Sequence, residues 1–183
     1  MSKKLSNYYP VWVEFVVLFL IFYSFYLVVT AYPVLPEKVP THFGPSSTPD
    51  AWGPKSYILV IPFVQIGLYT LMTVLTLFMV KSTNPMRFVN LPISKTRIQV
   101  LDEYWIENIR KVVVRDVFSL KAVIMAMLTY LVYITIQVAM GNCEGLGWGI
   151  GLFIALLLII VGVMTLNIYR IVWEAESNKV KKY

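Results

Sequence analysis

Four long apolar segments alternate with polar connections along this sequence. The apolar segments cover residues 11–32, 57–80, 122–140 and 148–168. A helix needs about 20 apolar residues to cross the roughly 30 Å of hydrocarbon in a bilayer. Each segment is close to that length, so the pattern predicts an all-α integral membrane protein with four transmembrane helices. We expect residues 1–183 to form a single membrane domain.

The connection at residues 81–121 contains an amphipathic repeat. Its apolar residues recur every three or four positions, and charged residues such as Glu107 and Arg110 fall on the other side of the same helix. The repeat predicts a cytoplasmic amphipathic helix that lies on the inner membrane surface. Docking on a cytosolic partner or another subunit would produce the same pattern. The apolar residues are Ile98, Leu101, Trp105, Ile109 and Val112.

Composition supports a membrane location. The chain is 58% hydrophobic and 14% charged, whereas soluble domains are roughly 45–50% apolar and about 25% charged. One cysteine, Cys143, cannot form an internal disulfide, and one histidine, His42, cannot supply a histidine-rich zinc site. We therefore expect the lipid bilayer as the main partner, and neither a cofactor nor a bound metal.

Positive charge predicts the orientation of the chain. Of the 16 Lys and Arg residues, 14 lie in the N-terminal segment, the 81–121 connection and the C-terminal segment, and two lie in 33–56. Cytoplasmic segments of membrane proteins carry the excess of positive charge. We therefore expect a multi-pass protein of the cell membrane with both termini in the cytoplasm. The net charge of +6 is then explained by the basic cytoplasmic segments, and we expect no nucleic-acid partner.

The predicted outer loop, residues 33–56, is rich in proline. Its six prolines fix the backbone repeatedly and remove hydrogen-bond donors, which excludes a helix and disfavours a central strand. We expect an extracytoplasmic chain of rigid turns. The residues in it that carry chemistry are Pro40, His42, Phe43, Asp50, Trp52 and Lys55.

This loop resembles a known signature. Residues 35–44 (LPEKVPTHFG) and 49–55 (PDAWGPK) are similar to the pattern LPxxVPxHF(G/N)xxGxPDxWGxK of the domain-of-unknown-function family 1648. The family consists of prokaryotic membrane proteins and includes the N-terminal part of an immunity protein against a sporulation-delaying peptide toxin. The resemblance implies a role in binding or sensing a peptide. This chain has Ser47 where the family usually has glycine, which predicts a different turn there.

The polar residues of the loop allow several interpretations. His42 and Asp50 could form a proton-responsive pair, or they could hold the loop through hydrogen bonds, and we favour the structural role. A metal site would need Glu37 and Glu144 as well, and their spacing does not favour one. The chain has no recognisable catalytic motif, so we expect no enzymatic activity. Phe43 and Trp52 would receive a ligand or rest in the membrane interface.

A few residues in and beside the apolar segments are unusual. Glu14 is charged and lies one turn inside the first segment, where reaching back to the surface would keep it hydrated. Gly141, Gly145 and Gly149 recur at a spacing that permits close helix packing, although loop flexibility explains them equally well.

The sequence favours a non-enzymatic membrane protein that binds or senses a peptide or partner protein at the outer face. The alternative is a small accessory subunit of a larger membrane complex, and the oligomeric state stays open. A transporter whose path includes Glu14, Gln65 and Asn167 is the third hypothesis.

Overall fold

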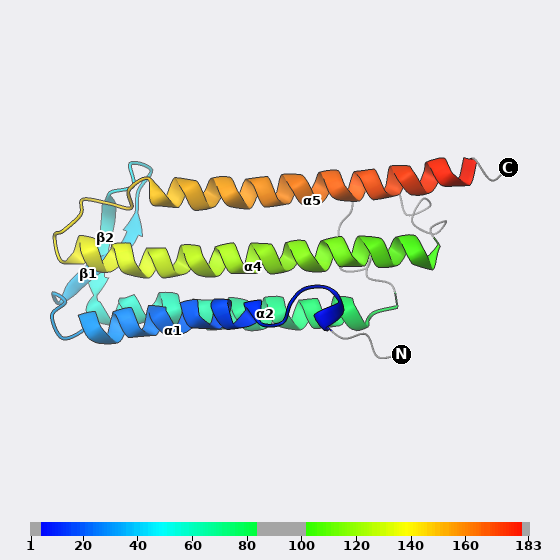
Figure 1. Ribbon diagram of the computed structural model, residues 1–183. Coiled ribbons are helices and arrows are strands. Elements are labelled where there is room, and N and C mark those ends of the chain that lie inside the picture. Colours follow the sequence, from blue (N-terminus) through cyan, green and yellow to red (C-terminus); the bar gives the residue numbers. More distant parts are fainter. Residues whose placement is uncertain (1–4, 84–101, 181–183) are drawn as a thin grey trace. The chain divides into compact units, whose positions relative to one another are not determined.

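The computed structural model describes residues 5–83 and 102–180 (Figure 1). The first half of the chain contains the 3-10 helix η1 (Leu5–Asn7), helix α1 (Val13–Ala31), strands β1 (Lys38–Phe43) and β2 (Pro49–Pro54), the 3-10 helix η2 (Lys55–Leu59) and helix α2 (Val60–Lys81). Two long helices follow, α4 (Glu103–Ala139) and α5 (Gly149–Val180).

Four helices in the described part of the chain are long and apolar enough to cross a membrane. They are Val13–Ala31, Lys55–Lys81, Glu103–Ala139 and Gly149–Ala175, where the second includes η2. These helices contain the four apolar segments of the sequence almost completely. The prediction of a largely helical, multi-pass membrane protein is therefore confirmed at this level.

The chain divides into two compact units. The unit that we call the hairpin unit contains Trp12–Leu71 and Lys121–Leu157, and the terminal unit contains Met1–Val11, Met72–Leu120 and Leu158–Tyr183. Residues 1–4, 84–101 and 181–183 are outside the described part of the terminal unit.

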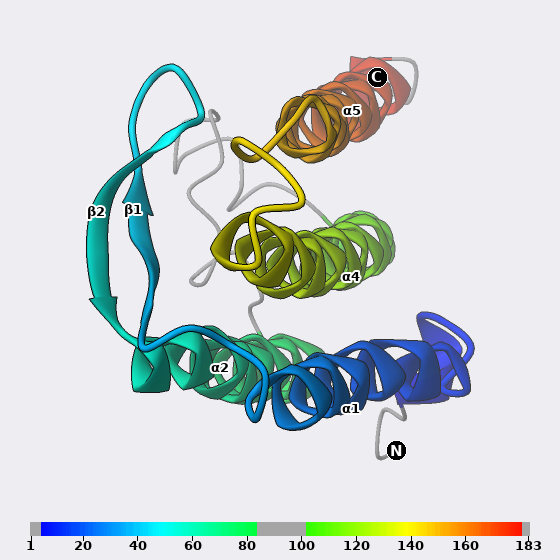
Figure 2. The ribbon, with the colours of Figure 1, turned by 90° about the vertical axis from the view of Figure 1, so that its left-hand side faces the viewer.

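Within the hairpin unit, α1 and α4 run in the same direction and α2 runs against them. Glu14 bonds to Lys121 and Ser24 bonds to Thr129, so residue numbers rise together along α1 and α4. Residues near the start of α2 lie close to the end of α4, where an apolar core forms. This core contains Val28, Leu35, Val39, Ile58, Val132 and Ile136. Figure 2 shows this end of the unit, with both strands beside it.

Helix α4 is longer than the sequence predicted. We expected a surface helix followed by a span at residues 122–140, whereas α4 is one continuous helix of 37 residues. No glycine or proline occurs between Glu103 and Ala139, so nothing in the local sequence ends the first part. Trp105, Ile109 and Val112 lie near its start, and Ile98 and Leu101 lie outside the described residues.

Candidate functional site: the β-hairpin and the polar core

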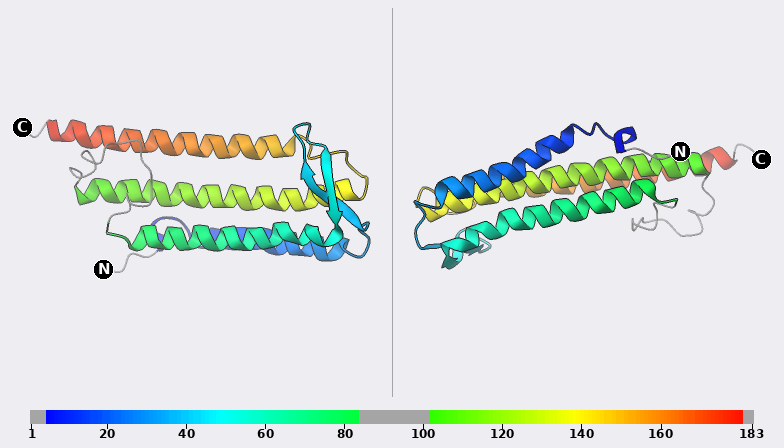
Figure 3. Two further views of the ribbon diagram at one scale, coloured as in Figure 1. Left: turned by 180° about the vertical axis from the view of Figure 1, so that it is seen from behind. Right: turned by 90° about the horizontal axis from the view of Figure 1, so that it is seen from below.

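The proline-rich segment forms a two-stranded antiparallel hairpin, which differs from the chain of turns that the sequence predicted (Figure 3). Lys55 N donates to Glu37 O at 3.0 Å. Because hydrogen-bonded and non-bonded pairs alternate along an antiparallel ladder, the pairs Lys38–Pro54 and Pro40–Trp52 fall at non-bonded positions. The missing N–H groups of Pro54 and Pro40 therefore cost the ladder no hydrogen bond, and the prolines are compatible with strands.

One residue of the hairpin turn, Ser47, has a backbone conformation that glycine usually adopts. Gly44 N donates to Thr48 O at 2.9 Å, Ser47 N donates to Gly44 O at 2.8 Å, and Ser47 has a φ of 63°. A turn followed by a residue in this left-handed region is a common way to close a three-residue hairpin loop. The serine thus adopts a conformation that glycine favours, and the expectation that the turn would differ receives no support.

The tip of the hairpin is bonded to the loop between α4 and α5. Leu146 N donates to Ser47 O at 2.9 Å. A side chain at Gly145 would collide with the same carbonyl oxygen, so glycine is required for this approach. Gly149 similarly packs against the ring of Tyr130, whose hydroxyl donates to Leu146 O at 2.6 Å. Two of the three regularly spaced glycines therefore allow close packing.

The anchored hairpin presents polar and aromatic side chains to its surroundings. His42 Nδ1 and Asp50 Oδ1 are 2.5 Å apart, and the two side chains are 68% and 51% exposed. Trp52 is half exposed, Phe43 is partly buried and Pro40 is buried. Pro40 thus packs inward, while His42, Asp50 and Trp52 remain accessible to a binding partner.

Lys55 belongs to a different cluster, at the base of the hairpin. Its Nζ donates to Glu37 Oε1 at 2.9 Å and lies 5.4 Å from the centre of the Tyr32 ring. The six loop residues singled out in the sequence therefore divide into the group on the two strands and Lys55 at the base. In the described part of the chain, no group of three or more His, Cys, Asp or Glu residues is placed to hold a metal ion.

A second polar cluster, which sequence reasoning largely missed, lies inside the hairpin unit. Gln65 Nε2 donates to Met125 O at 3.1 Å and to Thr129 Oγ1 at 3.0 Å, and Ser24 Oγ is 3.0 Å from Thr129 Oγ1. Ser24 and Gln65 are completely buried. Gln65 Oε1 has no hydrogen-bond partner among the described residues. The three apolar segments contain other polar residues as well, so nothing in the sequence marks Ser24, Gln65 and Thr129 as one group.

Glu14 is held by an ion pair. Lys121 Nζ donates to both carboxylate oxygens of Glu14, at 2.6 and 2.8 Å, and lies 4.9 Å from the centre of the Tyr69 ring. The lysine side chain is 1% exposed and the glutamate side chain 13%. The expectation that Glu14 reaches back to the surface is therefore wrong. Sequence reasoning counted Lys121 with the polar connection, so it could not identify the pair.

In the terminal unit, Arg110 caps the end of α2. Its Nη1 donates to the carbonyl oxygens of Met79 at 2.5 Å, Val80 at 3.2 Å and Ser82 at 2.6 Å, and its Nε donates to Glu107 at 3.0 Å. The carbonyls of Met79 and Val80 belong to the last turn of α2, where carbonyl groups have no partner within the helix, and a cation is favourable at a helix C-terminus. Arg110 is 1% exposed, so it does not lie on an open polar side facing the lipid headgroups, as the repeat predicted.

The same network ties the N-terminal segment to α4. Tyr8 OH donates to Glu107 at 2.8 Å, and Arg115 Nε donates to Tyr8 O at 2.8 Å. Burial, followed by the hydrogen bond to Glu107, raises the pKa of Tyr8 to about 12. Ile109, from the predicted apolar face, is buried, and Trp105 and Val112 are partly buried. The first turns of α4 thus combine apolar packing with a polar network.

The segment that contains the hairpin matches a known protein family. Residues 18–66 match the family described as Domain of unknown function (DUF1648). The matched segment begins inside α1, includes both strands and ends in α2. The resemblance seen in the loop motif is therefore confirmed for this part of the chain. No curated protein and no solved structure matches the chain.

Proposed function

We propose that this protein is a non-enzymatic receptor of the cell membrane that binds or senses a peptide or partner protein through the exposed side of its hairpin. In this proposal the hairpin faces the outside and both termini lie in the cytoplasm. The distribution of 14 against two positive residues supports that orientation.

One observation carries the proposal: the hairpin is fixed at both ends, and polar and aromatic side chains on it are still exposed. Val39 at its base is completely buried in the apolar core, and Ser47 at its tip is bonded to Leu146. Binding residues are commonly carried by loops that a rigid scaffold holds in place. Trp52, His42 and Asp50 meet this description, because the hairpin carries an exposed amphipathic ring and an exposed pair of hydrogen-bonding side chains.

The proposal can be tested by enrichment of secreted peptides. Purified protein is incubated with culture supernatant of the producing cells, and bound peptides are quantified by mass spectrometry. We expect a discrete peptide that the wild type retains and that Trp52→Ala and His42→Ala release. Trp148→Ala is the matched control, because Trp148 is 82% exposed and lies outside the hairpin. Equal losses of bound peptide in Trp148→Ala and Trp52→Ala would contradict a binding site on the hairpin.

The accessory-subunit alternative is supported by α5. This helix contains the most apolar of the four candidate spans, and none of its most apolar window is buried against the described chain. Lipid covers such a surface adequately, and so would a neighbouring subunit. Cross-linking in native membranes followed by purification distinguishes the two, because a subunit would carry a stoichiometric partner along α5.

A further inference from the structure

An apolar cavity lies at the base of the hairpin, apart from His42, Asp50 and Trp52. It has a volume of about 260 Å³ and is lined by Val28, Val29, Tyr32, Pro33 and Leu59. These residues belong to the last turn of α1, the residues just after it and the end of η2. The cavity therefore lies where two of the apolar spans meet the polar hairpin. In the proposed topology this is the level of the membrane surface.

A cation lies directly beside this cavity. Tyr32 contributes to the cavity wall, and Lys55 Nζ lies 5.4 Å from the centre of the same ring. Glu37 accepts one hydrogen bond from Lys55, but an ammonium group has three N–H donors. The Glu37 side chain is 88% exposed, so water weakens its hold on the lysine. Lys55 can therefore donate to a second anionic oxygen.

We propose that this place binds an anionic phospholipid, with part of one acyl chain in the cavity and the headgroup phosphate on Lys55. The cavity is smaller than the roughly 300–1,000 Å³ of a site for a whole drug-sized ligand, so it accommodates only a portion of a chain. A bilayer supplies molecules with an apolar chain and an anionic head at this depth. The site uses other residues than the proposed peptide site, so the two proposals fail separately.

The physical chemistry predicts where selectivity comes from. An acyl chain gains little by leaving lipid for an apolar cavity, because the two surroundings are similarly apolar. The phosphate of either lipid can accept the charge-assisted bond from Lys55, so the preference depends on the rest of the headgroup. The quaternary ammonium of a phosphatidylcholine places a second positive charge beside Lys55, whereas a phosphatidylglycerol places none. An anionic lipid should be preferred over a zwitterionic lipid with identical chains.

Native mass spectrometry of the detergent-solubilised full chain tests this inference. Dioleoyl phosphatidylglycerol and dioleoyl phosphatidylcholine are added in equal amounts. We expect a preference for the phosphatidylglycerol of about five-fold, because two like charges about 4 Å apart repel by roughly 1 kcal/mol in water. Lys55→Gln should abolish the preference, and Lys55→Arg should retain it and show that the loss is not a folding defect. Val29→Phe, at a position 67% exposed, should fill the cavity and reduce binding of both lipids.

Lys38→Gln is the matched control, because it removes the same charge from an exposed position on β1. It should leave the preference unchanged. Equal binding of the two lipids to the wild type would overturn the proposal. An equal loss of the preference in Lys38→Gln and Lys55→Gln would also overturn it, because it would indicate a general attraction of anionic lipids to the protein surface. Unchanged lipid binding in Val29→Phe would show that the cavity does not hold the acyl chain. An apolar side chain of a bound peptide found in the cavity would show the same.

Discussion

At the scale of single residues, Ser47 closes the hairpin turn in a backbone conformation that glycine favours. Its φ of 63° lies in a region that costs a non-glycine residue about 1–2 kcal/mol. Part of that cost is offset because serine restricts the unfolded chain more than glycine does. The hydrogen bond from Leu146 to the Ser47 carbonyl group holds the strained residue in place.

Ser47→Gly should therefore stabilise the protein, by about 0.5–1 kcal/mol in the free energy of unfolding. Reversible unfolding in mixed detergent micelles measures the change. Ser46→Gly, one residue earlier, is the control and should give no stabilisation. Gly145→Ala should destabilise the protein, because its methyl group would collide with the Ser47 carbonyl oxygen. A destabilised Ser47→Gly variant would show that the tip does not adopt this turn.

Tyr8 predicts a pH dependence of stability. Its pKa rises from 10.0 to about 12 in the folded protein, first because of burial and then because of the bond to Glu107. The unfolded chain loses this proton at lower pH than the folded chain does. The stabilisation is thus fully present below pH 10.0 and is lost as pH rises towards 12. Tyr8→Phe should flatten that decline, measured by unfolding across this range. A parallel decline in both proteins would rule out a shifted Tyr8.

At the scale of elements, the Glu14–Lys121 pair joins two parallel helices near one end of their contact. Buried charges are costly to dehydrate, and removal of one partner leaves the other uncompensated. Lys121→Met should therefore lower the free energy of unfolding by about 3 kcal/mol, while Glu14→Gln combined with Lys121→Met should cost much less. The same micelle assay measures both variants.

The exposed Arg170–Glu174 pair on α5 provides the control for this experiment. Its side chains are 78% and 39% exposed, so Arg170→Met should cost less than about 1 kcal/mol. If Lys121→Met were equally mild, the ion pair would not be buried as the structure has it.

The elements also show what sequence patterns can and cannot predict. Apolar segments of sufficient length identified the four long helices of the described residues, because length and composition decide whether a helix can span a bilayer. Counting prolines failed for the loop, because compatibility with a strand depends on which ladder position each proline occupies. Pro40 and Pro54 both fall at positions that need no donor.

The amphipathic repeat predicted a helix correctly but misplaced Arg110. It assigned Arg110 to the open polar side that faces the lipid headgroups, since charge usually marks exposure. The structure buries Arg110 against the end of α2, a helix about 30 residues earlier in the chain. Such a contact depends on tertiary packing, which periodicity within one segment does not contain. The Ser24, Gln65 and Thr129 cluster escaped prediction for the same reason.

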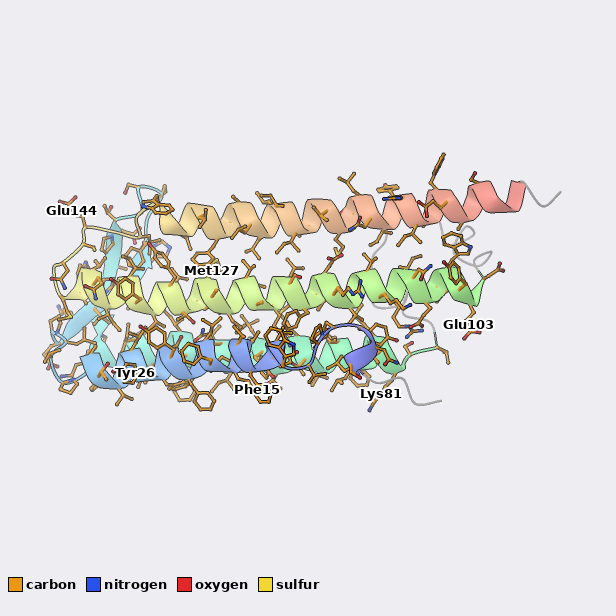
Figure 4. All side chains as sticks on the ribbon, in the orientation of Figure 1. Phe15, Tyr26, Lys81, Glu103, Met127 and Glu144 are labelled. Carbon is orange, nitrogen blue, oxygen red and sulfur yellow. The ribbon has the colours of Figure 1, made fainter. Side chains whose placement is uncertain are left out.

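At the scale of the whole molecule, orientation is the first requirement of the proposed receptor. Cys143, the only cysteine of the chain, is exposed in the loop that also bonds the hairpin tip. A membrane-impermeant maleimide should label it in intact cells. Lys81 is the last residue of α2 (Figure 4), and Lys81→Cys in a Cys143→Ala background should be labelled only after the membrane is permeabilised. The reverse pattern would place the hairpin in the cytoplasm and contradict a receptor of external ligands.

Photo-cross-linking in intact cells tests the central claim most directly. A benzophenone amino acid replaces Ala51, an exposed residue that is paired with His42 on the anchored hairpin, and in a control it replaces Trp148. A receptor that binds through the hairpin predicts one discrete adduct at position 51 that disappears in the His42→Ala background and is absent at position 148. If position 51 gives no adduct, or the same adducts as position 148, the hairpin is not the binding site and the proposed function is wrong.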